Sequence, residues 1–221
     1  MALQERVPQK YEFLVALDFE ATCEENIKIK PQEIIEFPCI KFCTKSFKEV
    51  SRFHSYVKPV HHPKLSDFCV RLTHITDCQL QDKPNFEEVF KNVNEWMKKE
   101  NINESNSIFI TFGDWDLKTM LRDQCATSKL EVPKVFDHWI NIRKTYNILM
   151  KAFPQGIDEM LEGLGEKFDG HLHSGIDDSY NIGRIIQKLN EKFPNYVFSP
   201  NGRFISQEEV NRRRAAEYSN Q

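Results

Sequence analysis

The sequence predicts a single α/β domain whose helices pack on a mixed sheet, and three observations predict it. The apolar run at 13–17 does not alternate with polar residues, which indicates a strand buried on both faces. Two segments rich in β-branched and aromatic residues, 34–43 and 50–57, extend it into a predicted three-stranded meander. From residue 86 onward, helical patterns alternate with a further strand, which is typical of layered α/β folds.

The elements can be placed in order along the chain. The first strand is expected at 11–18, and Pro59 and Pro63 end the meander before a short helical segment at 65–73. The most clearly marked helix begins after Pro84-Asn85. Its apolar residues recur at helical spacing and are Phe86, Val89, Phe90, Val93 and Met97.

A fourth strand is expected at 107–112, and Gly113 ends it before an amphipathic segment. Further helices are expected at 139–150, 157–164 and 177–190. These patterns divide the chain into a polar extension at 1–10, a domain at 11–192 and a charged tail at 193–221.

Composition sets loose limits on function. With 221 residues, 40% of them hydrophobic, the chain can bury one substantial core. The net charge of −3 does not indicate nucleic acid, but an acidic metal site and basic surroundings can cancel in such a sum. The six cysteines form no C-x-x-C pair, which favours reduced thiols in a cytosolic or nuclear protein. We expect no signal peptide, no membrane span and no secretion, because long apolar runs are missing.

Two carboxylates follow the first strand. Asp18 and Glu20 are two positions apart, so both side chains leave the strand by the same face. Two desolvated negative charges repel unless a cation compensates them, and oxygen ligands suit magnesium or manganese. The alternative is that Asp18 caps the following loop while Glu20 points to water.

A second acidic pair lies where the fourth strand turns into its helix, which is a usual place for sites in α/β sheets. Asp114 and Asp116 both occur there. We assign Asp114 to capping the helix, the commonest use of aspartate at such a position, and Asp116 to the metal site.

The last predicted helix separates two further aspartates by face. Asp178 shares a stripe with Ile182, Ile185, Ile186 and Leu189, so it is expected to point toward the sheet as a ligand. Asp177 shares its face with residues predicted to be solvated, which are Asn181, Arg184 and Lys188.

His173 lies five residues before Asp178 in a glycine-flanked loop. Beside four carboxylates it is the natural general base, because histidine side chains accept a proton from water near neutral pH. His171 is the alternative base, and a lone loop histidine is otherwise solvated. Two metals about 4 Å apart can bind the attacking and leaving oxygens of a phosphodiester, so the predicted chemistry is phosphoryl-transfer hydrolysis.

These residues resemble the three motifs of the DEDDh exonucleases, in the superfamily of ribonuclease T and the proofreading exonucleases. Longer segments resemble the Eri-type branch, which includes the histone-mRNA 3′ exonuclease and its prion-interactor-type relatives. These segments are 18–23, 33–38, 65–69, 113–116 and 139–141. The resemblance covers residues 11 to 190 and implies a ribonuclease H-like exonuclease fold, with a mixed central sheet of about five strands and helices on both faces.

The resemblance also implies a 3′-to-5′ exoribonuclease that releases 5′-mononucleotides from single-stranded RNA. Asp18, Glu20, Asp116 and Asp178 would hold two Mg²⁺ ions, with Mn²⁺ able to substitute. His173 would deprotonate the water, and Glu20 would take part in catalysis as well as binding metal.

Four further residues are implied to bind substrate. Phe68 and Trp115 would stack on the terminal base, where stacking contributes on the order of 1–3 kcal/mol. The backbone at Ala21 and Thr22 would meet the terminal ribose. Without the resemblance, Phe68 is expected to be a core residue and Trp115 a lid over the sheet edge.

Other functions stay open at this point. One is a nuclease that acts on DNA or short oligonucleotides, since selection of the 2′-OH depends on backbone shape. Another is a nucleic-acid-binding adaptor with weak activity. Only ten polar residues precede the region of resemblance, so we expect no separate RNA-binding module before it, and specific recognition of a stem-loop stays open. The arginines of the tail could contact an RNA backbone or lie on a solvated helix; they are Arg203, Arg212, Arg213 and Arg214.

Overall fold

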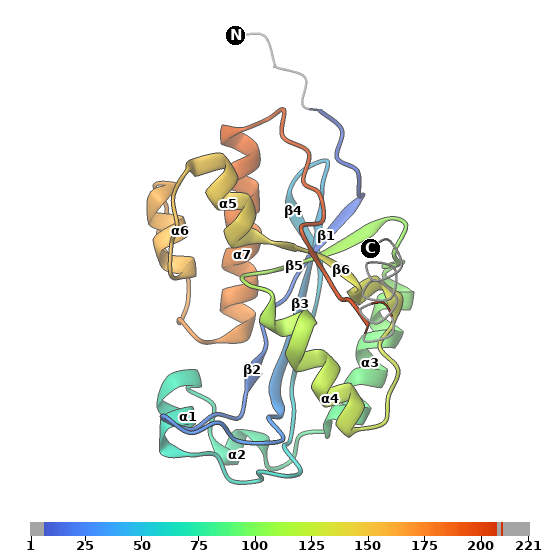
Figure 1. The fold of residues 1–221 in the computed structure, drawn as a ribbon, viewed down its shortest axis with the longest axis vertical. Helices are drawn as coiled ribbons and strands as arrows, with labels where there is room; N and C mark the ends of the chain where they lie inside the picture. Colours follow the sequence, from blue (N-terminus) through green and yellow to red (C-terminus); the bar gives the residue numbers. More distant parts are fainter. Residues whose placement is uncertain (1–6, 207–208, 210–221) are drawn as a thin grey trace, which may run out of the picture.

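A mixed seven-stranded sheet forms the centre of the chain (Figure 1). The computed structural model describes residues 7–206 and residue 209, so Arg212, Arg213 and Arg214 lie outside the described residues. The strands are β1 (Phe13–Ala16), β2 (Glu20–Ala21), β3 (Ile34–Cys43), β4 (Lys48–Tyr56), β5 (Ser107–Thr111), β6 (His138–Asn141) and β7 (Gly202–Arg203). They lie in the order β2-β3-β1-β5-β6-β7, and β4 pairs with the free side of β3.

The helices follow the strands along the chain. They are α1 (Asp67–Thr73), α2 (Asp77–Leu80), α3 (Phe86–Lys99), the π-helical turn η1 (Asp116–Met120), α4 (Leu121–Thr127), the 3-10 turn η2 (Lys134–Phe136), α5 (Ile142–Met150), α6 (Ile157–Gly163) and α7 (Gly175–Lys192). Strands β1, β5 and β6 run parallel to one another. Their carboxyl ends therefore meet at one edge of the sheet, where the loops that follow them gather.

Side chains that alternate along β1 build two separate layers. Val15 packs with α3 and α4 on one face, and Leu14 and Ala16 pack with α5, α6 and α7 on the other. Figure 1 shows these two groups of helices on opposite sides of the sheet. Burial of one large apolar side chain contributes about 1.5–3 kcal/mol to the stability of the fold. The two apolar layers therefore stabilise the packing of the helices on both faces of the sheet. The predicted α/β class with helices on both faces is confirmed.

One predicted helix is wrong at its beginning. Residues 139–141 were expected to start a helix, but they belong to β6, which pairs in parallel with β5. Trp139 and Ile140 are fully buried, so four residues suffice for an inner strand, and a helix then begins directly at Ile142. The two-residue strands β2 and β7 are too short to show a periodic pattern, and the sheet accordingly has seven strands rather than about five.

The face of α7 that was predicted to be solvated is partly covered. Asn181 is fully buried, and its amide donates to the carbonyls of Asp169 and Asp177. Arg184 donates to the Lys167 carbonyl and pairs with Glu166. The loop between α6 and α7 thus lies over this face, which the helical pattern alone could not reveal.

The segment after α7 returns to the sheet. Phe198 is buried with the residues under α7, and Gly202–Arg203 forms β7 against β6. No helix in the described part of the chain has both the length and the apolar character needed to cross a membrane.

Candidate active site

Asp18 lies just after the carboxyl end of β1, and Glu20 is the first residue of β2. Asp18 is half-buried just after β1, and Glu20 is buried in β2. Burial raises the pKa of Asp18 well above its usual range, and the charges of Asp116, Asp178, Glu20 and Glu36 raise it further. Burial and the same kind of repulsion, chiefly from Asp178, raise the pKa of Glu20 to about 9. The acidic side chains therefore lie close enough to repel one another.

Asp116 reaches this group from η1. Its side chain is buried, and its Oδ1 accepts a hydrogen bond from the Phe19 backbone N–H at 3.0 Å. Burial raises the pKa of Asp116 to about 6, although hydrogen bonds from the Phe19 and Asp116 backbones oppose the shift. Single π-helical turns occur frequently at functional sites. The bond to Phe19 fixes Asp116 against the segment that carries Asp18 and Glu20.

Asp178 and His173 complete the group from the beginning of α7. Asp178 is buried, and its Oδ2 accepts from the His173 backbone N–H at 3.0 Å. Its Oδ1 is also buried but has no hydrogen-bond partner among the described residues. Ligand atoms of Glu20, His173 and Asp178 all lie within 4.8 Å of one another. The His173 side chain itself is exposed at the rim.

This arrangement fits a divalent cation. A buried carboxylate oxygen without a donor is costly, and burial raises the pKa of Asp178 to about 7. Clustered carboxylates that are difficult to ionise together become compatible when a hard cation lies among them. The oxygen-rich donor set suits magnesium, manganese or calcium better than zinc.

Glu36 on β3 holds the beginning of α7 and was not singled out by the sequence analysis. It is 1% exposed, and its carboxylate accepts from the backbone N–H groups of Gly175 at 2.9 Å and Ile176 at 3.2 Å. His54 Nε2 lies 2.8 Å from the same carboxylate. Ser174 is the N-cap residue, yet its side chain makes no capping bond within the described structure. Glu36 therefore replaces the local cap through a contact that links β3 to the helix carrying Asp178.

Gly175 explains how closely α7 can approach this edge. A Cβ at this position would lie 2.6 Å from the Asp18 carbonyl oxygen and 3.2 Å from Glu36 Oε2. Any larger residue would push α7 away from the end of β1. The absence of a side chain thus lets the helix that carries Asp178 lie directly against Asp18.

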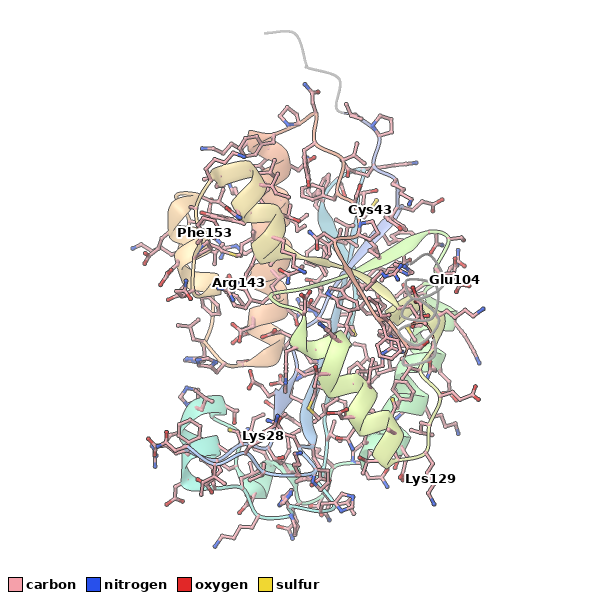
Figure 2. The ribbon with its side chains drawn as sticks, in the orientation of Figure 1. Lys28, Cys43, Glu104, Lys129, Arg143 and Phe153 are labelled. Atoms are coloured by element: carbon pink, nitrogen blue, oxygen red, sulfur yellow. The ribbon has the colours of Figure 1, made fainter. Side chains whose placement is uncertain are left out.

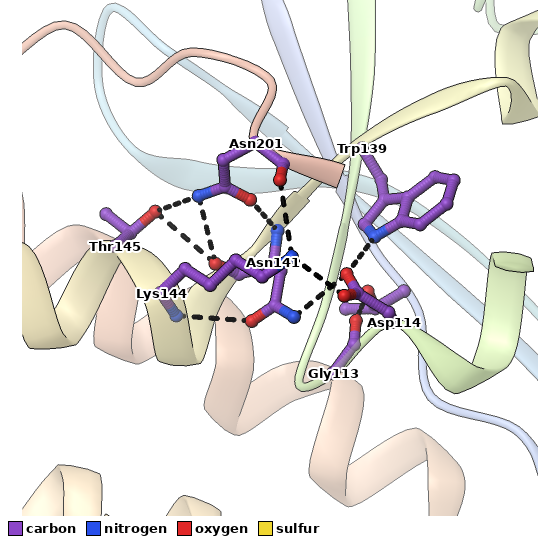
Figure 3. A network of polar contacts seen from close by, with 8 residues as sticks. Gly113, Asp114, Trp139, Asn141, Lys144, Thr145 and Asn201 are labelled. Carbon is purple, nitrogen blue, oxygen red and sulfur yellow. Dashed lines mark hydrogen bonds and ion pairs between the residues drawn. The ribbon is translucent and has the colours of Figure 1, made fainter. Parts of the chain in front are cut away.

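Asp114 does not cap a helix, so that prediction is wrong. Its Oδ1 accepts from Trp139 Nε1 at 3.0 Å and from Asn141 Nδ2 at 2.9 Å, and its Oδ2 pairs with Lys144 Nζ at 2.7 Å (Figure 3). Burial opposes ionisation, but hydrogen bonds, first of all from Lys144, outweigh it and lower the pKa of Asp114. These partners come from β6 and α5, which local helix-start patterns do not include.

The same network reaches the segment before β7. The Asn201 Oδ1 atom accepts from the Asn141 backbone N–H at 2.7 Å, and the Asn201 amide donates to the Asn141 carbonyl and to Thr145 Oγ1. Figure 3 shows these bonds as a continuous chain from the Gly113-Asp114 loop to Asn201. The loop that presents Trp115 and Asp116 is therefore anchored on three other parts of the fold.

The four residues implied to bind substrate differ in exposure. Trp115 is 41% exposed, and Phe68 is half-buried on α1, so both rings retain surface for stacking. Ala21 and Thr22 are buried. The Thr22 backbone and hydroxyl are already bonded to the Glu33 backbone.

Comparisons with known proteins agree with this geometry. The model of the RNase T family, described as exonuclease, matches residues 15–186. ERI1 exoribonuclease 3 of Homo sapiens is 45% identical over 185 residues, which are 82% of this chain and 55% of the relative. The 3′-5′ exoribonuclease 1 of Homo sapiens is 41% identical over 184 residues, 81% of this chain and 52% of the relative. The chain thus spans about half the length of these curated relatives.

A solved structure shows the same fold. The nuclease domain of 3′hExo, described as a DEDDh family member bound to rAMP, superposes with a TM-score of 0.82 and 37% identity. That match covers 88% of this chain and 98% of the other. A complex described as 3′-end specific recognition of a histone mRNA stem-loop by 3′-exonuclease has a TM-score of 0.79 and 37% identity, and its match covers 84% of each chain.

Proposed function

Because the chain belongs to the RNase T exonuclease family and to its Eri-type DEDDh branch, we propose that it is a 3′-to-5′ exoribonuclease. Members of this family depend on divalent cations. The substrate is the 3′ end of single-stranded RNA, and the product is a 5′-mononucleotide. The observation that carries the proposal is the approach of Glu20, His173 and Asp178 within 4.8 Å, where one buried Asp178 oxygen has no donor in the described structure.

Four acidic residues would hold two Mg²⁺ ions, for which Mn²⁺ would substitute. These residues are Asp18, Glu20, Asp116 and Asp178. When bound, the cations would supply electrostatic stabilisation for charge that develops on the attacking and leaving oxygens. The protein's own contribution is to hold the carboxylates in place, through the Phe19 N–H for Asp116 and the His173 N–H for Asp178.

His173 is the general base of this proposal. Its ring is exposed at the rim, within reach of water, while its backbone is fixed by Asp178. A ring nitrogen takes a proton from water as the water oxygen attacks the phosphorus. The bond from phosphorus to the upstream 3′-oxygen breaks, and that oxygen takes a proton from solvent water. The products are a nucleoside 5′-monophosphate and an RNA one nucleotide shorter.

The terminal nucleotide would lie between Phe68 and Trp115, with its ribose near the backbone of Ala21 and Thr22. The solved nuclease domain that is described as bound to rAMP supports this placement, because its match with this chain covers 98% of that domain. Selection of RNA over DNA would come from contacts with the 2′-OH at this position. An activity on DNA or short oligonucleotides is the second candidate, because stacking on aromatic rings does not distinguish the two polymers.

Digestion of 5′-labelled single-stranded RNA and DNA tests the proposal. We expect a ladder that shortens from the 3′ end in Mg²⁺, vanishes with chelator and vanishes in Asp18→Asn. Asp123→Asn is the matched control, because Asp123 is an exposed acid on α4. Digestion that persists in Asp18→Asn would refute the proposed catalyst. Binding of RNA by the wild-type protein without any cleavage would favour an adaptor instead.

A further inference from the structure

A cavity lies beside the loop that presents Trp115 and Asp116. It has a volume of about 380 Å³, and its lining includes Gly113, Asn141, Arg143, Lys144 and Phe153. The proposed reaction gives no role to this cavity. In Figure 2, Arg143 and Phe153 are labelled on the side of the molecule formed by α5 and α6.

Phe153 is unusual because its ring is 75% exposed. It lies in the connection between α5 and α6, directly before the buried Pro154. One exposed apolar residue needs no explanation by itself. This ring, however, lines a cavity that also has cationic and amide side chains, which are the groups that bind single-stranded nucleic acid.

Two cations line the cavity with one carboxylate. The Arg143 guanidinium lies 5.1 Å from the centre of the Phe112 ring, which orients it beside the cavity. Lys144 pairs with Asp114, whose oxygens already accept from Trp139 and Asn141. The acids nearest along the chain to Phe153 are Asp158 and Glu159, at the beginning of α6. With only two cations and one carboxylate in its lining, the cavity is not a strongly positive channel. It is instead suited to a nucleic acid strand that stacks one base and makes one or two phosphate contacts.

The cavity adjoins the loop that leads into the candidate active site. Gly113 and Asp114 line it, and the next two residues are the exposed Trp115 and the buried Asp116. Pro154, also in the lining, lies three residues before the beginning of α6. An RNA strand whose 3′ nucleotide occupies the acidic site has to cross the rim of that site with its 5′ remainder.

We propose that this cavity receives the part of the RNA strand upstream of its last two nucleotides, with a base stacked on Phe153 and a phosphate at Arg143. The inference rests on the proposed exoribonuclease function and adds a preference for substrate length. A dinucleotide is too short to reach the cavity, whereas an octanucleotide is long enough to occupy it. The cavity therefore strengthens binding of longer single strands without changing the chemical step.

Kinetics with an RNA dinucleotide and octanucleotide test this inference in Phe153→Ala. We expect KM for the octanucleotide to rise about 5- to 150-fold, the range for loss of one stacked base. We expect kcat for both lengths, and KM for the dinucleotide, to stay at wild-type values. Phe153→Trp should restore the octanucleotide KM. Ile148→Ala is the matched control, because Ile148 on α5 is 52% exposed and lies outside the cavity lining.

Arg143→Ala gives a second measurement. Loss of one phosphate contact should reduce the slope of log affinity against log salt by about 0.7 for the octanucleotide. If wild-type protein cleaves neither RNA, the proposed function fails. If wild type cleaves RNA but Phe153→Ala changes neither KM, or changes both lengths equally, the function stands and the upstream path is refuted.

Discussion

Replacing Glu36 by alanine should loosen the beginning of α7 and lower the rate of RNA cleavage. The carboxylate is 1% exposed and accepts from the backbone N–H groups of Gly175 and Ile176. Alanine leaves both amides without an acceptor at a helix end that has no side-chain cap in the described structure. Since α7 carries Asp178, we expect kcat to fall while KM for RNA changes little.

The magnitude follows from these contacts. The amide of the buried Gly175 and that of the half-buried Ile176 each cost about 1–3 kcal/mol when they lose their acceptor, so the sum is at most about 2–6 kcal/mol. Removal of one negative charge relieves repulsion, because Glu36 also raises the pKa values of Asp18, Glu20 and Asp178. The expected net loss in the free energy of unfolding is therefore in the lower part of that range, about 2–4 kcal/mol. Glu36→Gln keeps one acceptor oxygen and should lose less.

Urea unfolding in the presence of chelator measures this loss without a contribution from bound metal. Glu49→Ala is a suitable control, because Glu49 lies on the neighbouring β4 and pairs with Arg52 near the surface. Such surface pairs contribute about 0–1 kcal/mol. If Glu36→Ala and Glu49→Ala lowered stability by the same small amount, the role of Glu36 as a tertiary cap would be refuted.

Three further predictions follow from the site. His173→Ala should lower kcat strongly and leave RNA affinity nearly intact in a binding titration; a large loss of affinity would mean that His173 holds substrate. In chelator, the free energy of unfolding should fall as pH rises through 7. The reason is that Asp178 has a pKa of about 7 when folded and an ordinary value of 3.8, so the folded state holds this proton more tightly and loses that advantage when the proton leaves. Adding Mg²⁺ at pH 8 should restore the lost stability. A metal-free protein whose thermal unfolding did not change between pH 6 and 8 would contradict this. Asp114→Ala should raise KM and lower kcat together, because it releases the loop bearing Trp115; Lys144→Met, which leaves the bonds from Trp139 and Asn141 to Asp114 in place, should have the smaller effect.

Positions governed by local periodicity could be predicted from the sequence. Asp18 and Glu20 follow from alternation along a strand, and Asp178 follows from a helical stripe of isoleucines. Their relation to Asp116 could be anticipated because parallel strands end at one edge. The ligand roles stay proposals, but the described structure places these side chains where their charges interact.

Positions governed by tertiary partners could not be predicted in this way. Glu36 caps a helix that begins 139 residues later, and nothing near Glu36 in the sequence indicates that helix. Asp114 looks like a local cap until Trp139 and Lys144 are brought beside it by β6 and α5. The strand β6 itself is hidden, because four residues that lead directly into a helix show no separate period.

A crystal structure of the Mn²⁺-loaded protein with a 5′-mononucleotide would locate the metal ions through the anomalous signal of manganese. We expect two manganese peaks among the carboxylates of Asp18, Glu20, Asp116 and Asp178, with the nucleotide phosphate against them and its base beside Trp115. Manganese bound elsewhere, or a complex in which one of these four side chains points away from the metals, would contradict this expectation.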